Sequence, residues 1–163
     1  RLSDLEPENL NLKVKLGILY TDAKQYPEAL SIFKELLNSA PQSDKILYYL
    51  GAIHQELEQW ESSIEYFNQI PDSSALYSDS SIQMANMLST LAQDENMGKK
   101  EVRWQQAFLR HVNERMGTLP QMKLEFSVIK AGYFEAIGSF KQAMDTMMVV
   151  QDDKNFGLQH KYY

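Results

Sequence analysis

The sequence predicts an all-α fold, a solenoid of stacked antiparallel helix pairs. The first observation is a block that returns after 34 residues: Leu16-Gly17 recurs as Leu50-Gly51, and Phe33 recurs as Phe67. The second is that apolar residues inside each block follow helical spacing, with proline and turn residues between them. A fixed period of this size is typical of repeat proteins in which each helical hairpin packs on the next.

The composition agrees with a folded protein and argues against several classes of function. Of the 163 residues 44% are hydrophobic, with 7 glycines and 5 prolines, so the chain can bury a core. The net charge is -6 and no basic run exceeds Lys99-Lys100, so a nucleic-acid footprint is absent. No cysteine is present, which excludes disulfides and thiolate metal sites, and no stretch approaches the roughly 18 apolar residues of a membrane span. We expect a soluble chain, and the cytoplasm, the periplasm and the extracellular space are all compatible with it.

The first complete repeat, residues 9–42, is predicted as two helices joined by a turn at 24–27. Asn9 stands where an N-cap belongs, and Pro27 suits the first position of the second helix, where its missing N–H costs nothing. The helical spacing marks one buried face on the first helix and one on the second. These faces are Leu12, Leu16, Leu19 and Tyr20, then Ala29, Leu30, Phe33, Leu36 and Leu37.

The second repeat, residues 43–76, follows the same plan. Ser43 is the expected N-cap, Trp60 takes the turn position, and residues 71–74 break the second helix. The inward positions are Leu47, Leu50, Gly51 and Ile53 in the first helix, and Ser63, Ile64, Phe67 and Ile70 in the second.

This arrangement resembles the tetratricopeptide repeat, whose pattern is Trp-x2-Leu-Gly-x2-Tyr, then Ala-x3-Phe, then Pro. The matches are Leu16, Gly17, Tyr20, Ala29, Phe33 and Pro41 in the first repeat, and Leu50, Gly51 and Phe67 in the second. The departures are Lys13, Leu47, His54, Ser63 and Ala75. The resemblance implies a right-handed superhelix. Gly17 and Gly51 would let the two helices of a hairpin approach closely, where a side chain would clash.

The third repeat, residues 77–120, is degenerate. A step of 34 from Gly51 reaches Ala85, inside a helix expected over Ser80–Leu91. Residues 96–116 are predicted as one long helix that ends at 117–120. Its expected inward residues are Val102, Leu109, Val112 and Met116.

A fourth repeat, residues 121–154, resumes the pattern, with Ala131 at the glycine place of the motif. Gly17 and Ala131 are 114 residues apart, which is three periods and about 12 extra residues. Residues 1–8 are predicted as the tail of a preceding repeat and 155–163 as the start of a truncated one. The chain is therefore expected to be an internal fragment of a longer array, whose exposed apolar ends could self-associate.

The resemblance also implies a concave groove lined by the first helix of each hairpin, where a peptide or helix of a partner protein would bind. Tyr48 is the most prominent anchor. The lysine–asparagine clamp with which some family members hold chaperone tails is absent, because Val14 and Ile18 occupy its first places. The candidate groove residues are Asn11, Val14, Ile18, Thr21, Asp22, Lys45, Tyr48, Ala52, Gln55, Glu56, Ile82, Asn86 and Ser89.

No motif for catalysis, a cofactor or a metal occurs in the sequence. His54 occupies an aromatic place of the motif, which favours a structural role, whereas His111 is expected to be exposed beside Glu114. The eight methionines are expected to fill an irregular core in the second half, or else to form an adaptable binding surface. The basic positions of the long helix are either a contact surface for an acidic partner or an ordinary amphipathic face. They are Lys99, Lys100, Arg103, Arg110 and Arg115, interleaved with Trp104.

The function that follows is a protein-interaction scaffold without catalysis, whose partner is an unidentified protein or peptide. The alternative is a regulatory or structural segment of a larger enzyme or receptor whose active domain lies outside these residues. A catalytic motif in flanking sequence would favour the alternative, since a fold by itself does not give a function.

Overall fold

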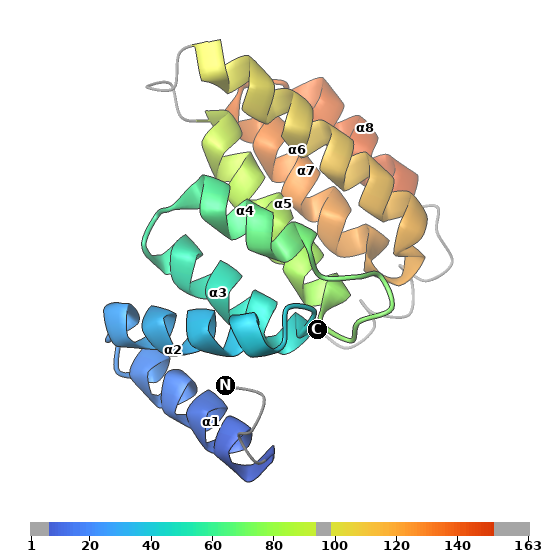
Figure 1. Ribbon diagram of the computed structural model, residues 1–163. Helices are drawn as coiled ribbons and strands as arrows, with labels where there is room; N and C mark the ends of the chain where they lie inside the picture. The colour runs from blue at the N-terminus through green and yellow to red at the C-terminus, as the bar shows by residue number, and fades with distance from the viewer. Residues whose placement is uncertain (1–6, 94–98, 152–163) are drawn as a thin grey trace. The chain divides into compact units, whose positions relative to one another are not determined.

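The structure, a computed structural model, describes residues 7–93 and 99–151, and over these ranges the regular elements are all helical, as predicted (Figure 1). In chain order they are α1 (Pro7–Asp22), α2 (Tyr26–Ser39), α3 (Asp44–Glu56), α4 (Trp60–Asn68), α5 (Tyr77–Gln93), α6 (Lys99–Thr118), the short 3-10 helix η3 (Pro120–Met122), α7 (Lys123–Ala136) and α8 (Phe140–Gln151). The chain divides into two compact units, residues 1–80 and 81–163, which are described separately. Residues 1–6 of the predicted first tail and all of 155–163 lie outside the described residues, as do Met97 and His160.

Three hairpins share one turn geometry. Lys24, Glu58 and Gly138 adopt positive φ angles of 57°, 55° and 74° at the turn between the paired helices. The next residue closes each turn by donating its backbone N–H five residues back, at 2.8 Å for Gln25 to Tyr20, 2.8 Å for Gln59 to His54, and 2.7 Å for Ser139 to Phe134. This is the Schellman ending of a helix. The three turns keep the offsets of 34 and 114 residues found in the sequence.

Alanine substitutions at two glycines, Gly138 in this turn and Gly132 in α7, are expected to change the stability of the chain in opposite directions. Gly138→Ala is expected to destabilise the chain by about 1 kcal/mol, because a Cβ at positive φ approaches the following carbonyl oxygen. Gly132→Ala is expected to stabilise it by about 0.5–1 kcal/mol, because Gly132 lies inside α7 and an added Cβ would meet nothing within 4 Å. Urea denaturation followed by circular dichroism measures both changes. Stability changes of the same sign for both substitutions would contradict the turn geometry.

Within unit 1 the two helices of each hairpin approach closely at a glycine, as the sequence predicted. A Cβ on Gly17 would lie 2.8 Å from Phe33 Cζ, and one on Gly51 would lie 2.7 Å from Phe67 Cε1. The facing small residue on α4, Ser63, is fully buried, and its hydroxyl donates to the Gly51 carbonyl at 2.8 Å. A buried backbone acceptor is therefore satisfied at the point of closest approach.

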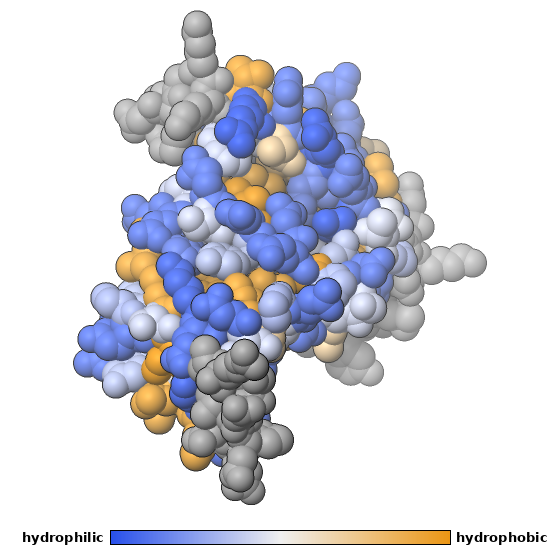
Figure 2. Space-filling view, viewed as in Figure 1, coloured by the Kyte–Doolittle hydropathy of each residue, from blue (hydrophilic) through white to orange (hydrophobic). Residues whose placement is uncertain are grey.

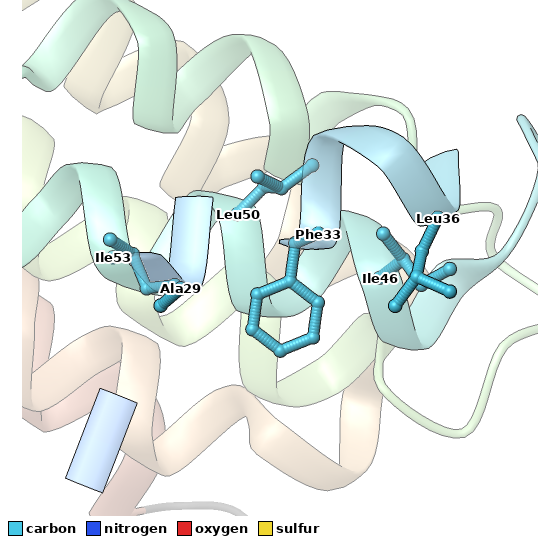
Figure 3. Close-up of a cluster of buried hydrophobic side chains, with 6 residues drawn as sticks. All are labelled: Ala29, Phe33, Leu36, Ile46, Leu50 and Ile53. Atoms are coloured by element: carbon cyan, nitrogen blue, oxygen red, sulfur yellow. The ribbon is translucent and has the colours of Figure 1, made fainter. Parts of the chain in front are cut away.

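The hydrophobic core of unit 1 lies between α2 and α3 (Figure 3). It consists of Ala29, Phe33 and Leu36 from α2 and Ile46, Leu50 and Ile53 from α3. Each of these side chains is at most 5% exposed. The Phe33 ring also stacks on Tyr49, with 5.0 Å between ring centroids. This packing joins the first hairpin to the second.

Two predictions about α1 are wrong. Asn9 is not an N-cap, because the helix already includes Pro7. Leu12, Leu16 and Leu19 do not form a buried face: they are 62%, 43% and 62% exposed. Within the described residues no helix covers this side of α1, whereas α2 covers the equivalent side of α3. Ser43 does stand at the N-cap of α3, although its side chain makes no capping hydrogen bond.

In unit 2 the long helix is present, and its inward face was predicted only in part. Val112 is fully buried as predicted, but Val102 is 56% exposed, and the other buried residues of α6 are Trp104, Phe108 and His111. His111, expected to be exposed, is 7% exposed, and its Nε2–H donates to the Ser81 carbonyl of α5 at 2.9 Å. Phe108 packs against Tyr133 of α7, with ring centroids 4.8 Å apart.

The methionines divide between core and surface. Met84 and Met87 of α5 are buried, in agreement with a core role. Met144 and Met148 of α8 are 65% and 58% exposed, so a core role is wrong for them. A core role was favoured over an adaptable binding surface because thioethers fill irregular spaces, but burial requires a helix lying over each side chain.

His111 is expected to make unit 2 less stable in mild acid. Burial lowers the pKa of His111 more than its hydrogen bond to Ser81 and the nearby Glu114 raise it. Below about pH 6.5 the unfolded chain therefore binds a proton that the folded chain does not yet bind, and stability falls by at most about 1.4 kcal/mol per pH unit for one such group. Chemical denaturation between pH 7 and pH 5 measures this slope. His111→Gln retains a donor and should flatten the slope; an unchanged slope would show that other groups cause it.

Candidate functional site

The candidate groove residues lie on the first helix of successive hairpins. Those of α1 and α3 belong to unit 1, and Ile82, Asn86 and Ser89 lie on the part of α5 that belongs to unit 2. The two groups are therefore described one at a time. That these residues form a binding surface stays a prediction.

On α1 the candidate positions form a row that is apolar in the middle and polar at its ends. Val14 and Ile18 are half-buried and pack against the core cluster of α2 and α3. Asn11 and Asp22 are exposed at either end. The Thr21 hydroxyl donates to the Gly17 carbonyl at 2.9 Å, which leaves its methyl group to contribute apolar surface.

On α3 the candidate row centres on Tyr48. Its ring is half-buried, 5.6 Å from the Phe67 ring of α4 and 6.4 Å from the neighbouring Tyr49 ring, measured between centroids. Ala52, one turn further on, is half-buried. Because two other rings hold it, Tyr48 presents part of an oriented aromatic surface. Lys45 and Glu56 are exposed at the two ends of the helix, and Gln55 is half-buried.

The α5 positions offer less surface. Ile82 is half-buried and Asn86 is exposed, but Ser89 is only 8% exposed. The Gln93 amide donates to both the hydroxyl and the carbonyl of Ser89, at 3.0 and 2.9 Å. The Ser89 hydroxyl is thus engaged within its own helix.

The electrostatics of this face are mild. The Tyr26 hydroxyl donates to Glu56 Oε2 at 3.3 Å, and desolvation together with the Glu56 charge raises the pKa of Tyr26. This contact ties the end of α3 to α2. Lys13, at the tryptophan place of the motif, forms an ion pair with Glu35 at 2.6 Å, so the departure from the pattern is used to join α1 to α2.

His54 has the contacts of a structural residue. Its Nδ1–H donates to Gln59 Oε1 at 2.6 Å, and its ring stacks on Tyr66 with centroids 5.3 Å apart. Burial lowers its pKa, so the neutral ring is favoured at pH 7. This arrangement replaces the tyrosine of the motif with a ring of similar shape.

The basic positions of α6 are only partly available to a partner. Arg103 and Arg110 are exposed and Arg115 is half-buried. Trp104 is 4% exposed, and the Arg103 guanidinium carbon lies 4.9 Å from the Trp104 ring centroid. The tryptophan is therefore a core residue beneath the arginine, and a contact surface for an acidic partner stays a prediction.

No cluster of three or more histidine, aspartate or glutamate side chains that could hold a metal ion occurs among residues 7–93 and 99–151. In the same ranges no helix is both long enough and apolar enough to cross a membrane.

Two residues that orient the candidate site were not singled out from the sequence. Phe67 was expected only as a core residue, although its ring lies against Tyr48, and Tyr49 was assigned no role. The adjacent aromatic pair Tyr48-Tyr49 was the available signal, since neighbouring helical residues point about 100° apart and one of them must face the core.

The fold and the helix rows together define an α-solenoid built from helical hairpins. A family model described as tetratricopeptide repeat matches residues 20–85. No curated protein matches this sequence. The crystal structure of a thermophilic TPR protein from Thermus thermophilus shares the fold, with a TM-score of 0.61 at 14% sequence identity, over 85% of this chain and 71% of that one.

Residues 20–85 thus match the tetratricopeptide-repeat family, and the fold is shared with a protein of that kind. Proteins of this fold generally mediate protein–protein interactions and are typically non-catalytic scaffolds.

Proposed function

We propose that this protein is a scaffold that binds a peptide or helix of a partner protein along the candidate positions of α1 and α3, without catalysis. The observation that carries the proposal is Tyr48, a half-buried aromatic side chain held against Phe67 and Tyr49. Large aromatic residues in such positions are typical anchors of protein interfaces.

The orientation of Tyr48 supports tight binding. A tyrosine has few rotatable bonds, and neighbouring rings already restrict this one, so little side-chain entropy remains to be lost when a partner binds. Ala52 follows Tyr48 by one helical turn. Its small side chain leaves room for a partner residue beside the ring.

The α1 row extends the same kind of surface. Val14 and Ile18 contribute half-buried apolar area, while Asn11 and Asp22 supply polar groups at its ends. A segment with apolar residues at helical spacing would match this pattern of an apolar centre with polar ends. The energy would come from a few anchors on a preformed face.

The test combines a double substitution with site-specific crosslinking. Tyr48→Ala with Gln55→Ala is expected to weaken partner binding at least about thirtyfold, because loss of an interface anchor typically costs 2 kcal/mol or more. A photoreactive amino acid at position 48 in the full-length protein first captures the partner from its native cell. Titration of the purified partner then measures the affinity, with circular dichroism to confirm folding.

The matched control is Lys34→Ala with Glu61→Ala, which removes two exposed side chains of the second helices α2 and α4. This variant should bind as the wild type does, and a photoreactive group at position 34 should give no adduct. Equal affinity of the Tyr48 double variant and this control would rule out the proposed face.

A further inference from the structure

The exposed side of α1 carries three leucines in one line. Leu12, Leu16 and Leu19 recur every three to four residues and are 62%, 43% and 62% exposed. Figure 2 shows orange, apolar surface over α1 and α2 at the lower left of the view. Contiguous apolar surface of this kind marks an interaction site more often than isolated apolar residues do. We call these three residues the α1 stripe.

The protein already shows how such a stripe is covered. Ile46, Leu50 and Ile53 of α3 occupy the same repeat positions 34 residues later, and they are 5%, 0% and 0% exposed. They are buried because α2 lies on them with its own line of Ala29, Phe33 and Leu36 (Figure 3). The α1 stripe therefore has the residue pattern that receives a helix like α2.

A helix with the pattern of α2 is α8, the last helix in the described part of the sequence. In α8, 114 residues beyond α2, Ala143, Met147 and Val150 occupy the places of Ala29, Phe33 and Leu36. Phe140 and Met144 occupy those of Tyr26 and Leu30, which are half-buried against the core cluster. On α8 the same two places are 66% and 65% exposed. We call Phe140 and Met144 the α8 stripe.

We propose that the α8 stripe of one copy covers the α1 stripe of a second copy, head to tail, in the way that Tyr26 and Leu30 of α2 pack against the core that α2 forms with α3. The occupant is a second copy because one contact then buries both stripes, and their residues correspond in position to those of a contact that the protein already makes. The interface is heterologous, so association continues to larger assemblies or closes into a ring.

This inference is independent of the groove. Val14 and Ile18 lie on the opposite side of α1 from the α1 stripe, since a helix turns 3.6 residues per revolution. The Tyr48 double variant should therefore self-associate as the wild type does. Failure of one proposal leaves the other unaffected.

Sedimentation velocity over a wide range of protein concentration tests the proposal. The average mass of the wild type should rise with concentration. Leu16→Glu blocks the α1 stripe and Met144→Glu blocks the α8 stripe, because each places an unpaired carboxylate in the contact and should weaken association at least about thirtyfold. The matched control is Val128→Glu, at an apolar residue of α7 that is 52% exposed and belongs to neither stripe, and it should associate as the wild type does.

An equimolar mixture of the two blocked variants distinguishes this geometry from others. The Leu16→Glu chain retains its α8 stripe and the Met144→Glu chain retains its α1 stripe, so the mixture should form a one-to-one dimer while each variant alone stays monomeric. Leu12→Glu, at a more exposed position, replaces Leu16→Glu if circular dichroism shows the latter to be unfolded. A wild type that is monomeric at every concentration, association that Met144→Glu leaves intact, or a mixture that stays monomeric would each overturn the proposal.

Discussion

Replacing Gly51 with leucine is expected to cost about 3 kcal/mol or more of folding free energy and to loosen the hairpin of α3 and α4. Even the first added carbon would lie 2.7 Å from Phe67 Cε1. The Phe67 ring is 2% exposed and lies against Tyr48, so it has little room to move away. A loss of this size is a large fraction of the roughly 5–15 kcal/mol that stabilises a typical domain.

Urea denaturation followed by circular dichroism would measure the effect of Gly51→Leu. Gly117→Leu is the matched control, because Gly117 lies near the end of α6 and an added Cβ would meet nothing within 4 Å. It should change stability by less than about 0.5 kcal/mol. Gly17→Leu should resemble Gly51→Leu, since a Cβ there would lie 2.8 Å from Phe33. Equal midpoints for Gly51→Leu and Gly117→Leu would refute the close approach of the two helices.

The second large effect is a difference in stability between alanine substitutions of Leu50 and Leu16, two leucines at the same repeat position. Leu50→Ala is expected to cost about 3 kcal/mol, because Leu50 is fully buried between α2 and α3 and its truncation leaves a cavity. Leu16→Ala should cost about 1 kcal/mol or less, because Leu16 is 43% exposed and much of its side chain stays in water.

Thermal and urea unfolding at low protein concentration would measure this pair, so that association between copies does not contribute. A cost for Leu16→Ala as large as that for Leu50→Ala would mean that the α1 stripe is covered within a single chain. The difference between the two variants thus reports directly on whether a helix lies over each leucine.

The hairpins could be predicted from the sequence because the interactions that form them are local. Gly51 must face an aromatic residue of the next helix, and the turn at Glu58 follows from a helix end and a helix start close together. The first hairpin repeats both features 34 residues earlier. The start of α1 was misplaced at Asn9 because a polar residue before an apolar run is also compatible with a position inside the first turn.

The candidate site residues could be assigned to their helices from the sequence, but the side chains that pack around them could not be predicted. Counting from Gly51 placed Tyr48 on the first helix of its hairpin, as the structure has it. That the Phe67 ring lies against Tyr48 depends on how α3 and α4 pack, and spacing within one helix does not contain this information. The same limit explains Ser89, which counting offered as a surface residue and which is 8% exposed.

The inward face of α6 illustrates a related ambiguity. Val102 and Trp104 are both apolar and both lie on the helix that the sequence predicted, yet Val102 is 56% exposed and Trp104 4%. The hydrogen bond from His111 to Ser81 and the packing of Phe108 against Tyr133 fix which side of α6 faces the core. Both involve residues of other helices, at long separation in the chain.

Residue type and spacing were therefore sufficient for the all-α class, the hairpins and their 34-residue step, because helical periodicity, turn geometry and close helix approach act between residues near in sequence. Burial was decided by tertiary structure alone. Leu16 and Leu50 are the same residue at the same repeat position, and only the second has a helix lying over it. The hydrophobic effect acts on area removed from water, and that area depends on neighbours that the local sequence does not name.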